Sequence, residues 1–175
     1  MEVTSKNIVL VGPMGSGKTT IGRRLAHELN QDFFDTDHVI IEKTGVSIDH
    51  IFDIEGEEGF RKRESKILEN LCQMSNIILA TGGGIVILPE NRKILKNAGL
   101  VVYLYSSVEQ LLRRTAKSKT RPLLENSTDR KKTITELLEA RDKYYREVAS
   151  LVIDTTGKNL HEIIKVIMQE NENVE

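Results

Sequence analysis

The sequence predicts a single α/β domain built on an open, parallel, five-stranded sheet with helices on both faces. Two observations support this fold class. Short apolar runs alternate along the chain with longer amphipathic segments, which is typical of parallel sheets covered by helices. The length of 175 residues suits one domain, and no internal repeat and no linker rich in Gly, Ser or Pro divides the chain. We therefore expect one domain over residues 1–175.

The first half of the chain predicts three of the five strands. The run that follows Asn7 is wholly apolar, so the first strand is expected to be fully buried. Ile21, Leu25 and Leu29 recur at helical spacing, and Ser47 is a suitable N-cap for a short helix. In order, we expect a strand, a glycine-rich turn, a helix, a strand, a short helix, a long charged helix and a strand, at residues 7–11, 12–18, 19–30, 33–37, 47–52, 57–74 and 76–81.

The second half predicts the remaining strands. Pro89 is placed near the start of a helix that Gly99 is expected to end, and the tail from Gln169 is expected to fray. The segment 117–132 is polar and too long for a routine connection, so we expect a lid, at about residues 115–132, or a disordered segment. The other elements are expected as a strand, two helices, a strand and a helix at residues 100–105, 108–116, 133–149, 151–154 and 160–168.

The composition excludes several classes of protein. A net charge of -1 argues against a general binder of nucleic acid or membrane surfaces, which normally carries a basic excess. The single Cys72 cannot form an internal disulfide, which indicates a reducing compartment, and its leucine-rich helical setting favours a buried apolar side chain over a nucleophile. The four histidines show no metal-ligand spacing, and no apolar run suits a signal sequence or a membrane span. We expect a cytoplasmic monomer.

The strongest motif runs from Gly12 to Thr19 and fits G-x-x-x-x-G-K-[ST] at every fixed position. Its glycines let backbone N–H groups surround an anion, and the helix that follows adds its positive end. Lys18 can reach the β- and γ-phosphates of a nucleotide, and the Thr19 hydroxyl can ligate Mg²⁺. A chance glycine turn is the alternative, but the motif follows a buried strand and opens an amphipathic helix. The expected ATP-binding residues here are Gly12, Gly15, Ser16, Gly17, Lys18, Thr19 and Thr20.

Two further segments are expected at the same edge of the sheet, because each follows a strand. In an extended chain Asp35 and Asp37 point to opposite sides, so one can face a metal and the other a substrate hydroxyl; alternatively, Asp37 is a helix N-cap. Three consecutive glycines, residues 82–84, offer unhindered N–H groups and close approach to a ligand, or form only a sharp turn. No Asp ends the third strand, which weakens the GTPase and motor-ATPase interpretations and moves the metal-binding role to Asp35.

Basic side chains complete the candidate site. Arg61 and Arg141 suit carboxylates or phosphates, although each alone is more often a solvated surface arginine. The region from Arg113 to Arg146 is locally basic, but no aromatic residue lies between Tyr105 and Tyr144. Such a segment makes a poor stacking surface for nucleic acid and fits better as a lid that closes on phosphates.

Taken together, the motifs resemble the shikimate kinase family over nearly the whole chain. The motifs that carry the resemblance are G-P-M-G-S-G-K-T at 12–19, F-D-T-D at 34–37, S-I-x-x-I-F-x-x-x-G-E-x-x-F-R-x-x-E at 47–64, G-G-G at 82–84 and R-P-L-L at 121–124. The lid tip, Lys117-Ser118-Lys119, is more basic than is usual for the family, and Gly59 is expected to loosen the helix before Phe60.

The resemblance implies a nucleoside-monophosphate-kinase-like fold, with a substrate-binding helical region at about residues 35–64. It implies transfer of the γ-phosphoryl group of ATP to the 3-hydroxyl of shikimate, on the pathway to chorismate and the aromatic amino acids. In this interpretation Lys18, Asp37 and Arg121 are catalytic, Thr19 and Asp35 bind Mg²⁺, and the lid arginine Arg121 neutralises charge on the transferred group. The implied shikimate-binding residues are Asp37, Phe52, Phe60, Arg61, Gly82, Gly83, Gly84 and Arg141, and further implied ATP-binding residues are Arg114, Arg121, Thr155 and Lys158.

Three alternatives stay open on the residues alone. Gluconate kinase is a rival small-metabolite kinase on the same scaffold, although F-R-x-x-E and R-P-L-L favour shikimate. A non-catalytic binding module would not need Lys18, Asp37 and Arg121 together. A nucleic-acid-dependent NTPase would be expected to carry a basic excess and stacking aromatic residues.

Overall fold

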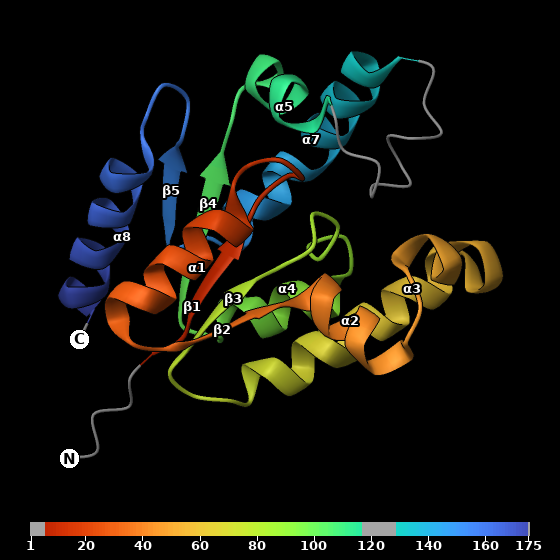
Figure 1. Ribbon diagram of the computed structural model, residues 1–175, viewed down its shortest axis with the longest axis horizontal. Helices are drawn as coiled ribbons and strands as arrows, with labels where there is room; N and C mark the ends of the chain where they lie inside the picture. Colours follow the sequence, from red (N-terminus) through yellow and green to blue (C-terminus); the bar gives the residue numbers. More distant parts are fainter. Residues whose placement is uncertain (1–5, 117–128, 175) are drawn as a thin grey trace.

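The computed structural model describes residues 6–116 and 129–174. Within them the five predicted strands form one parallel sheet in the order β2-β3-β1-β4-β5 (Figure 1). The strands are β1 (Ile8–Val11), β2 (Asp32–Asp35), β3 (Ile77–Ala80), β4 (Leu100–Tyr105) and β5 (Leu151–Asp154). The helices are α1 (Lys18–Leu29), α2 (Thr36–Thr44), α3 (Ile48–Cys72), α4 (Pro89–Lys96), α5 (Val108–Thr115), α7 (Arg130–Val148) and α8 (Leu160–Val174). The predicted α/β class and the parallel five-stranded sheet are confirmed.

The central strand β1 is buried on both faces because each face packs against helices. Ile8 and Leu10 pack with α1 and α8, whereas Val9 and Val11 pack with α3 and α7. This alternation is the period of an extended strand, and it explains why the run is apolar without interruption. Figure 1 shows α8 and α1 on one side of the sheet and α3, α4 and α7 on the other.

The pairing of β1 determines where the sheet is expected to form a ligand-binding crevice. Its two neighbours are β3 and β4, which lie on opposite sides of it and are reached by separate crossovers. In open α/β sheets a crevice forms at such a switch point, outside the carboxyl ends of the strands. The segments that follow β1, β2 and β3 meet there.

Two predicted helix ends are wrong. The chain does not fray from Gln169, because α8 continues to Val174, whose carbonyl oxygen accepts a hydrogen bond of 3.1 Å from Lys6 Nζ. Gly99 does not end α4: Asn97 is the C-cap, and Gly99, with a φ of 130°, directly precedes β4. A Cβ on Gly99 would collide with the carbonyl oxygen of Asn7, so a close backbone approach requires glycine there.

The helix predicted from residue 133 begins earlier, within the segment predicted to be a lid. Helix α7 begins at Arg130 behind the N-cap Asp129, so the end of segment 117–132 is helical. The Arg130 guanidinium donates to the carbonyl oxygens of Thr115 and Ala116 at 2.8 and 2.9 Å, where it ties α7 to the end of α5. Residues 117–128, which include the tip Lys117–Lys119, Arg121 and the rest of R-P-L-L, lie outside the described residues.

The two helices predicted over residues 47–74 are one element with a bend. Ser47 caps its start as predicted, by accepting a hydrogen bond from the His50 N–H. Gly56, with φ 71° and ψ −178°, is non-helical and bends α3. The expectation that Gly59 loosens the helix is wrong, because the break lies three residues earlier.

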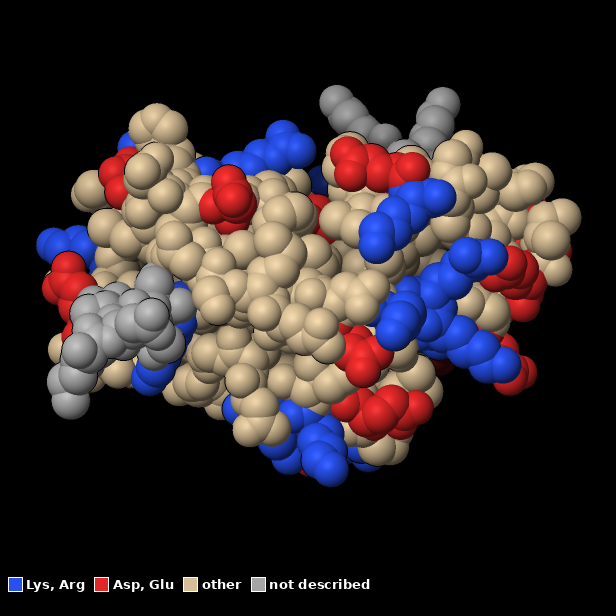
Figure 2. All heavy atoms as spheres, turned by 90° about the horizontal axis from the view of Figure 1, so that it is seen from below, with Lys and Arg blue, Asp and Glu red and all other residues tan. Residues whose placement is uncertain are grey.

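The described surface mixes both signs of charge. On the face in Figure 2, Lys and Arg side chains are interspersed with Asp and Glu, and neither sign forms a continuous stripe across it. None of the helices in the described ranges has the length and apolar character needed to cross a membrane.

Candidate active site

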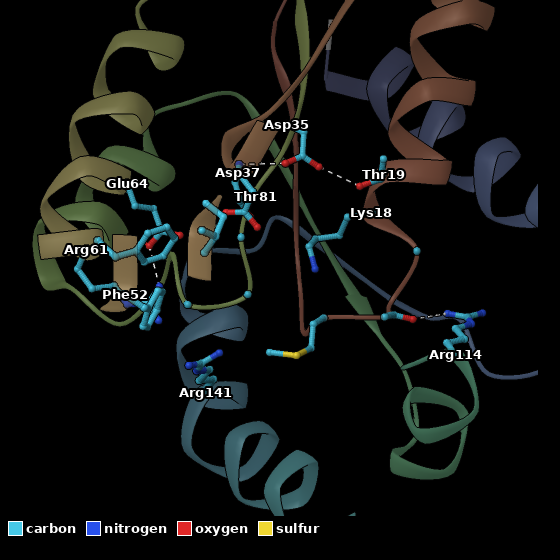
Figure 3. Close-up of a pocket in the computed structure, with 18 of the residues that line it drawn as sticks. Lys18, Thr19, Asp35, Asp37, Phe52, Arg61, Glu64, Thr81, Arg114 and Arg141 are labelled. Carbon is cyan, nitrogen blue, oxygen red and sulfur yellow. Dashed lines mark hydrogen bonds and ion pairs between the residues drawn. The ribbon is translucent and has the colours of Figure 1, made fainter. Parts of the chain in front are cut away.

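A cavity of about 430 Å³ opens at the carboxyl edge of β1, β2 and β3 (Figure 3). Its wall is formed by the glycine-rich loop, the start of α2, both limbs of α3, the triple-glycine turn, and one arginine each from α5 and α7. The lining residues are Met14, Gly15, Gly17, Lys18, Thr19, Thr20, Asp35, Asp37, Ile48, Phe52, Phe60, Arg61, Glu64, Thr81, Gly82, Gly83, Gly84, Arg114 and Arg141.

The glycine-rich loop has the backbone of a phosphate cradle. Gly15 and Gly17 have φ values of 83° and 95°, which L side chains rarely adopt, and α1 begins directly after them at Lys18. A Cβ on Gly12 would lie 2.8 Å from the Leu104 carbonyl oxygen, so this approach also needs glycine. Lys18 Nζ donates to the carbonyl oxygens of Gly12 and Pro13 at 2.7 and 2.8 Å. The helix N-terminus and the lysine suit a nucleotide phosphate at this point.

The residues at the predicted metal site fit Mg²⁺. Thr19 Oγ1 donates to Asp35 Oδ2 at 2.9 Å, which places a hydroxyl and a carboxylate, both hard oxygen donors, side by side. The described residues contain no group of three or more His, Cys, Asp or Glu side chains placed to hold a metal. Mg²⁺ in kinase sites is usually bound by one or two carboxylates together with phosphates and water.

The two aspartates differ from the arrangement predicted by an extended chain. Asp35 ends β2, and its Oδ1 accepts from the N–H groups of Asp37 and His38, so Asp35 is the N-cap of α2. Asp37 lies in the first turn of that helix and faces the cavity. The alternative in which Asp37 caps the helix is therefore wrong, because Asp35 has that role.

Arg61 is buried against two acidic side chains of its own helix. Only 8% of its surface is exposed, and its Nη1 and Nη2 donate to Glu64 and Glu57 at 2.9 and 3.2 Å. Glu64 has no exposed surface, and burial raises its pKa to about 7 against the lowering effect of the Arg61 charge. The negative charge of Asp37 raises this pKa further.

The triple-glycine turn leaves room for these ionic groups. A Cβ on Gly82 would lie 2.7 Å from Glu64 Oε2, and a Cβ on Gly84 would overlap the guanidinium of Arg61. The N–H of Gly82 donates to Thr36 Oγ1 at 2.9 Å, which fixes the start of the turn. The glycines thus do more than turn the chain, because ionic side chains occupy the space that their own side chains would take.

Arg141 approaches the same cavity from α7. It is 6% exposed, and within residues 6–116 and 129–174 it forms no ion pair with an acidic side chain. A buried guanidinium normally has an anionic partner. Arg141 and Arg61 both line the cavity, so their positions favour a ligand whose negative group lies between them.

An apolar wall completes the cavity. Phe52 and Phe60 pack with ring centroids 4.8 Å apart and come from the two sides of the bend at Gly56. The Arg61 guanidinium lies 5.2 Å from the centroid of Phe60. Arg114 Nη1 donates to the Gly15 carbonyl oxygen at 3.2 Å, on the nucleotide side.

Some predicted residues do not line this cavity. Gly12 and Ser16 belong to the glycine-rich loop but do not line the cavity, and Thr155 and Lys158 lie on the segment after β5. Thr155 is buried and its hydroxyl donates to the Tyr105 carbonyl oxygen, so its side chain serves the sheet. Arg121 lies outside the described residues. Four further residues line the cavity without a role predicted from the sequence, namely Met14, Ile48, Glu64 and Thr81. Of these, Glu64 could have been found from the sequence, because it is the last residue of the F-R-x-x-E motif.

Known proteins are similar to this chain in sequence and fold. The family model for shikimate kinase matches residues 14–172. Shikimate kinase of Thioalkalivibrio sulfidiphilus is 50% identical over 163 residues, 93% of this chain and 85% of that protein. The solved structure of shikimate kinase from Acinetobacter baumannii in complex with shikimate has a TM-score of 0.94 and 45% identity, over 98% of this chain and 96% of that one. A gluconokinase from Sinorhizobium meliloti, with a TM-score of 0.63 and 18% identity over 98% of this chain and 94% of that one, shares the fold alone. The chain belongs to the shikimate kinase family.

Proposed function

We propose that this protein transfers the γ-phosphoryl group of ATP to the 3-hydroxyl of shikimate, giving shikimate 3-phosphate and ADP. This step belongs to the pathway to chorismate and the aromatic amino acids. One observation carries the proposal: two buried guanidinium groups, on Arg61 and Arg141, face the cavity that also contains the phosphate-loop lysine Lys18. A small carboxylate next to a nucleotide phosphate satisfies all three cations.

On the nucleotide side, the phosphate loop binds ATP and Arg114 contacts it from α5. Thr19 and Asp35 hold Mg²⁺, which neutralises charge on the phosphates when bound. Lys18 bridges the β- and γ-phosphates. Arg121, in the predicted lid, supplies a further positive charge to the transferred group. We assign Gly12 and Ser16 to the shape of the loop, and Thr155 and Lys158 to the neighbourhood of the adenine.

On the substrate side, Arg61 and Arg141 hold the carboxylate of shikimate and Gly83 donates its N–H. Phe52 and Phe60 form the apolar wall against the ring. The mixture of one apolar wall with a few converging polar groups is usual for small-molecule sites.

Catalysis follows from position and charge, because phosphoryl transfer asks little covalent chemistry of the protein. Asp37 faces the cavity and orients the attacking hydroxyl, and it accepts the hydroxyl proton as the bond to phosphorus forms. Lys18 and Arg121 stabilise the charge that develops on the γ-phosphoryl oxygens.

A coupled assay of ADP release tests the function. Turnover should require both ATP and shikimate, and gluconate should not replace shikimate. Arg61→Ala and Arg141→Ala should each weaken shikimate binding roughly ten- to hundred-fold and leave ATP binding nearly unchanged, because each removes a charge-assisted hydrogen bond to the carboxylate. Arg24→Ala is the matched control, since Arg24 is exposed and pairs with Glu28 away from the cavity. ADP release that is indifferent to shikimate would refute the proposal.

We further propose that the protein acts in the cytoplasm as a monomer and binds neither nucleic acid nor membrane. The lone Cys72 and the net charge of -1 support this. Sedimentation velocity at several protein concentrations tests the monomer.

A further inference from the structure

We propose that Tyr145 is a positioning residue for substrate binding, whose hydroxyl holds the triple-glycine turn in register with Arg61 and Arg141. The inference rests on the proposed function, because it concerns how the shikimate-binding groups keep their places. Tyr145 does not line the cavity, so it acts through other residues and touches no substrate.

The hydrogen bond of Tyr145 reaches the middle of the turn. Its side chain is fully buried in α7, and its Oη donates to the Gly83 carbonyl oxygen at 2.6 Å across 62 residues of sequence. Three consecutive glycines have no Cβ to restrict their backbone angles, so the turn depends on outside contacts for its shape. Thr36 holds the N–H of Gly82, and Tyr145 holds the carbonyl of Gly83.

One hydrogen bond at Gly83 also places the neighbouring peptide group. The carbonyl of Gly83 and the N–H of Gly84 belong to the same planar unit, so fixing one orients the other. The Arg61 guanidinium packs where a Cβ of Gly84 would lie. A rotation of this peptide unit would therefore disturb both the backbone of Gly83 and the position of the Arg61 guanidinium.

Tyr145 also connects the turn with Arg141, which precedes it by one helical turn on α7. A Cβ on Gly83 would lie 3.6 Å from Arg141 Nη1. Burial raises the pKa of Tyr145 to about 12, while the charge of Arg141 and its hydrogen bond to the hydroxyl lower it, as does the charge of Arg61. The Glu64 charge acts in the opposite direction. The hydroxyl therefore stays protonated at neutral pH and remains a donor to Gly83.

The test compares Tyr145→Phe with Tyr103→Phe. Tyr103 is fully buried in β4, its ring centroid lies 4.9 Å from that of Tyr145, and its hydroxyl donates to Asp142 Oδ1 at 2.7 Å. Each substitution removes one hydroxyl and the part-buried hydrogen bond that it donates, to Gly83 or to Asp142, and Tyr145→Phe also removes the hydrogen bond between Arg141 and the hydroxyl. Stability against urea is therefore measured for both variants. The KM values for shikimate and for ATP, and kcat, are measured for both variants and the wild type.

We expect Tyr145→Phe to raise the KM for shikimate roughly three- to ten-fold, the range of one intramolecular hydrogen bond, and to leave the KM for ATP unchanged. Tyr103→Phe should change neither KM. If Tyr145→Phe matches Tyr103→Phe, or raises both KM values alike, the positioning role is refuted while the proposed function stands. A wild-type protein without shikimate-dependent ADP release would overturn the proposed function, and the inference with it.

Discussion

Two carboxylates that lie two positions apart in the sequence have different surroundings in this protein. Asp35 caps α2 and accepts from Thr19, so it serves both the helix and the proposed metal site. Asp37 caps nothing, and its side chain faces the cavity. We therefore assign Asp37, rather than Asp35, to the substrate hydroxyl.

Asp37→Asn should lower kcat by roughly 10²–10⁴-fold, the range of a lost general base, because an amide cannot accept the proton of the attacking hydroxyl. ATP binding should survive, since Asp37 does not contact the phosphate loop in the proposed arrangement. Single-turnover kinetics and ATP titration measure the two effects separately. Asp32→Asn, at the exposed start of β2, is the control. Unchanged turnover in Asp37→Asn would leave Asp37 without a catalytic task.

Glu64 should make stability depend on pH. Its pKa is about 7 in the folded protein against 4.5 for the free side chain. Below pH 4.5 the carboxyl group is protonated in both states. Between pH 4.5 and about 7 the unfolded chain loses the proton first, so the free energy of unfolding falls as the pH rises.

Glu64→Gln lacks this titration. The variant should therefore gain stability relative to the wild type by on the order of 3 kcal/mol between pH 4.5 and 7. Urea unfolding across this range measures the difference. Glu58→Gln, at an exposed position of the same helix, should show no such trend. If the free energies of unfolding of Glu64→Gln and the wild type differed by the same amount at every pH, Glu64 would not have a raised pKa.

Among the elements, α3 has the most unusual construction. Its first limb carries Phe52 and its second carries Phe60, with Gly56 between them. Arg63 donates to both oxygens of Glu55 at 2.6 and 2.7 Å, which ties the two limbs across the bend. The angle of this bend sets how Phe52 faces the cavity.

Gly56→Ala should destabilise the protein by about 1–3 kcal/mol, because φ 71° with ψ −178° is a region that essentially only glycine adopts. No atom lies within 4 Å of the new Cβ, so the cost is one of backbone conformation. Gly45→Ala is a matched control, since Gly45 also has a positive φ and open space but ends α2. Both variants should unfold at lower urea concentration, and only Gly56→Ala should raise the KM for shikimate. Equal KM values for shikimate in the two variants would show that the bend does not affect shikimate binding.

Strands β1, β3 and β4 were predictable because they are short apolar runs that are almost wholly buried. Helix ends were less predictable, since side chains distant in sequence decide them. Lys6 contacts the end of α8, and Arg130 ties the start of α7 to α5. The N-cap Asp129 is a local signal for the start of α7, but the end of α8 has no such signal. The bend at Gly56 was visible only as a gap between two expected helices.

At the scale of the whole molecule, segments from many parts of the chain meet at the site. The phosphate loop, the triple glycine and both arginines were predictable from motifs. Tyr145 was not, because its contact with Gly83 depends on how α7 packs against the turn after β3. Glu64 had a place in a motif, but its burial and raised pKa follow only from the folded structure.

Ligands should stabilise the whole domain, because each ligand binds the folded protein and contacts segments that unfold together. ADP at a hundred times its Kd should raise the free energy of unfolding by about 2.7 kcal/mol, and shikimate should add a similar amount. Lys18→Ala should lose most of the ADP effect and keep the shikimate effect. Arg24→Ala should keep both. Thermal unfolding with each ligand measures these shifts, and an ADP effect that survives in Lys18→Ala would contradict the assigned role of Lys18.

The sheet order has a consequence during synthesis on the ribosome. Ile8 in β1 pairs with Ile78 and with Leu100, so the central strand has no partner until much of the chain exists. At about 5–20 residues per second, β1 waits roughly 4–14 s for β3 and longer for β4. Throughout that time an apolar strand is open to aggregation. Its length of 4 residues, Ile8–Val11, is shorter than the segments of about six or seven residues that form stable fibrils, which limits this hazard in the nascent chain.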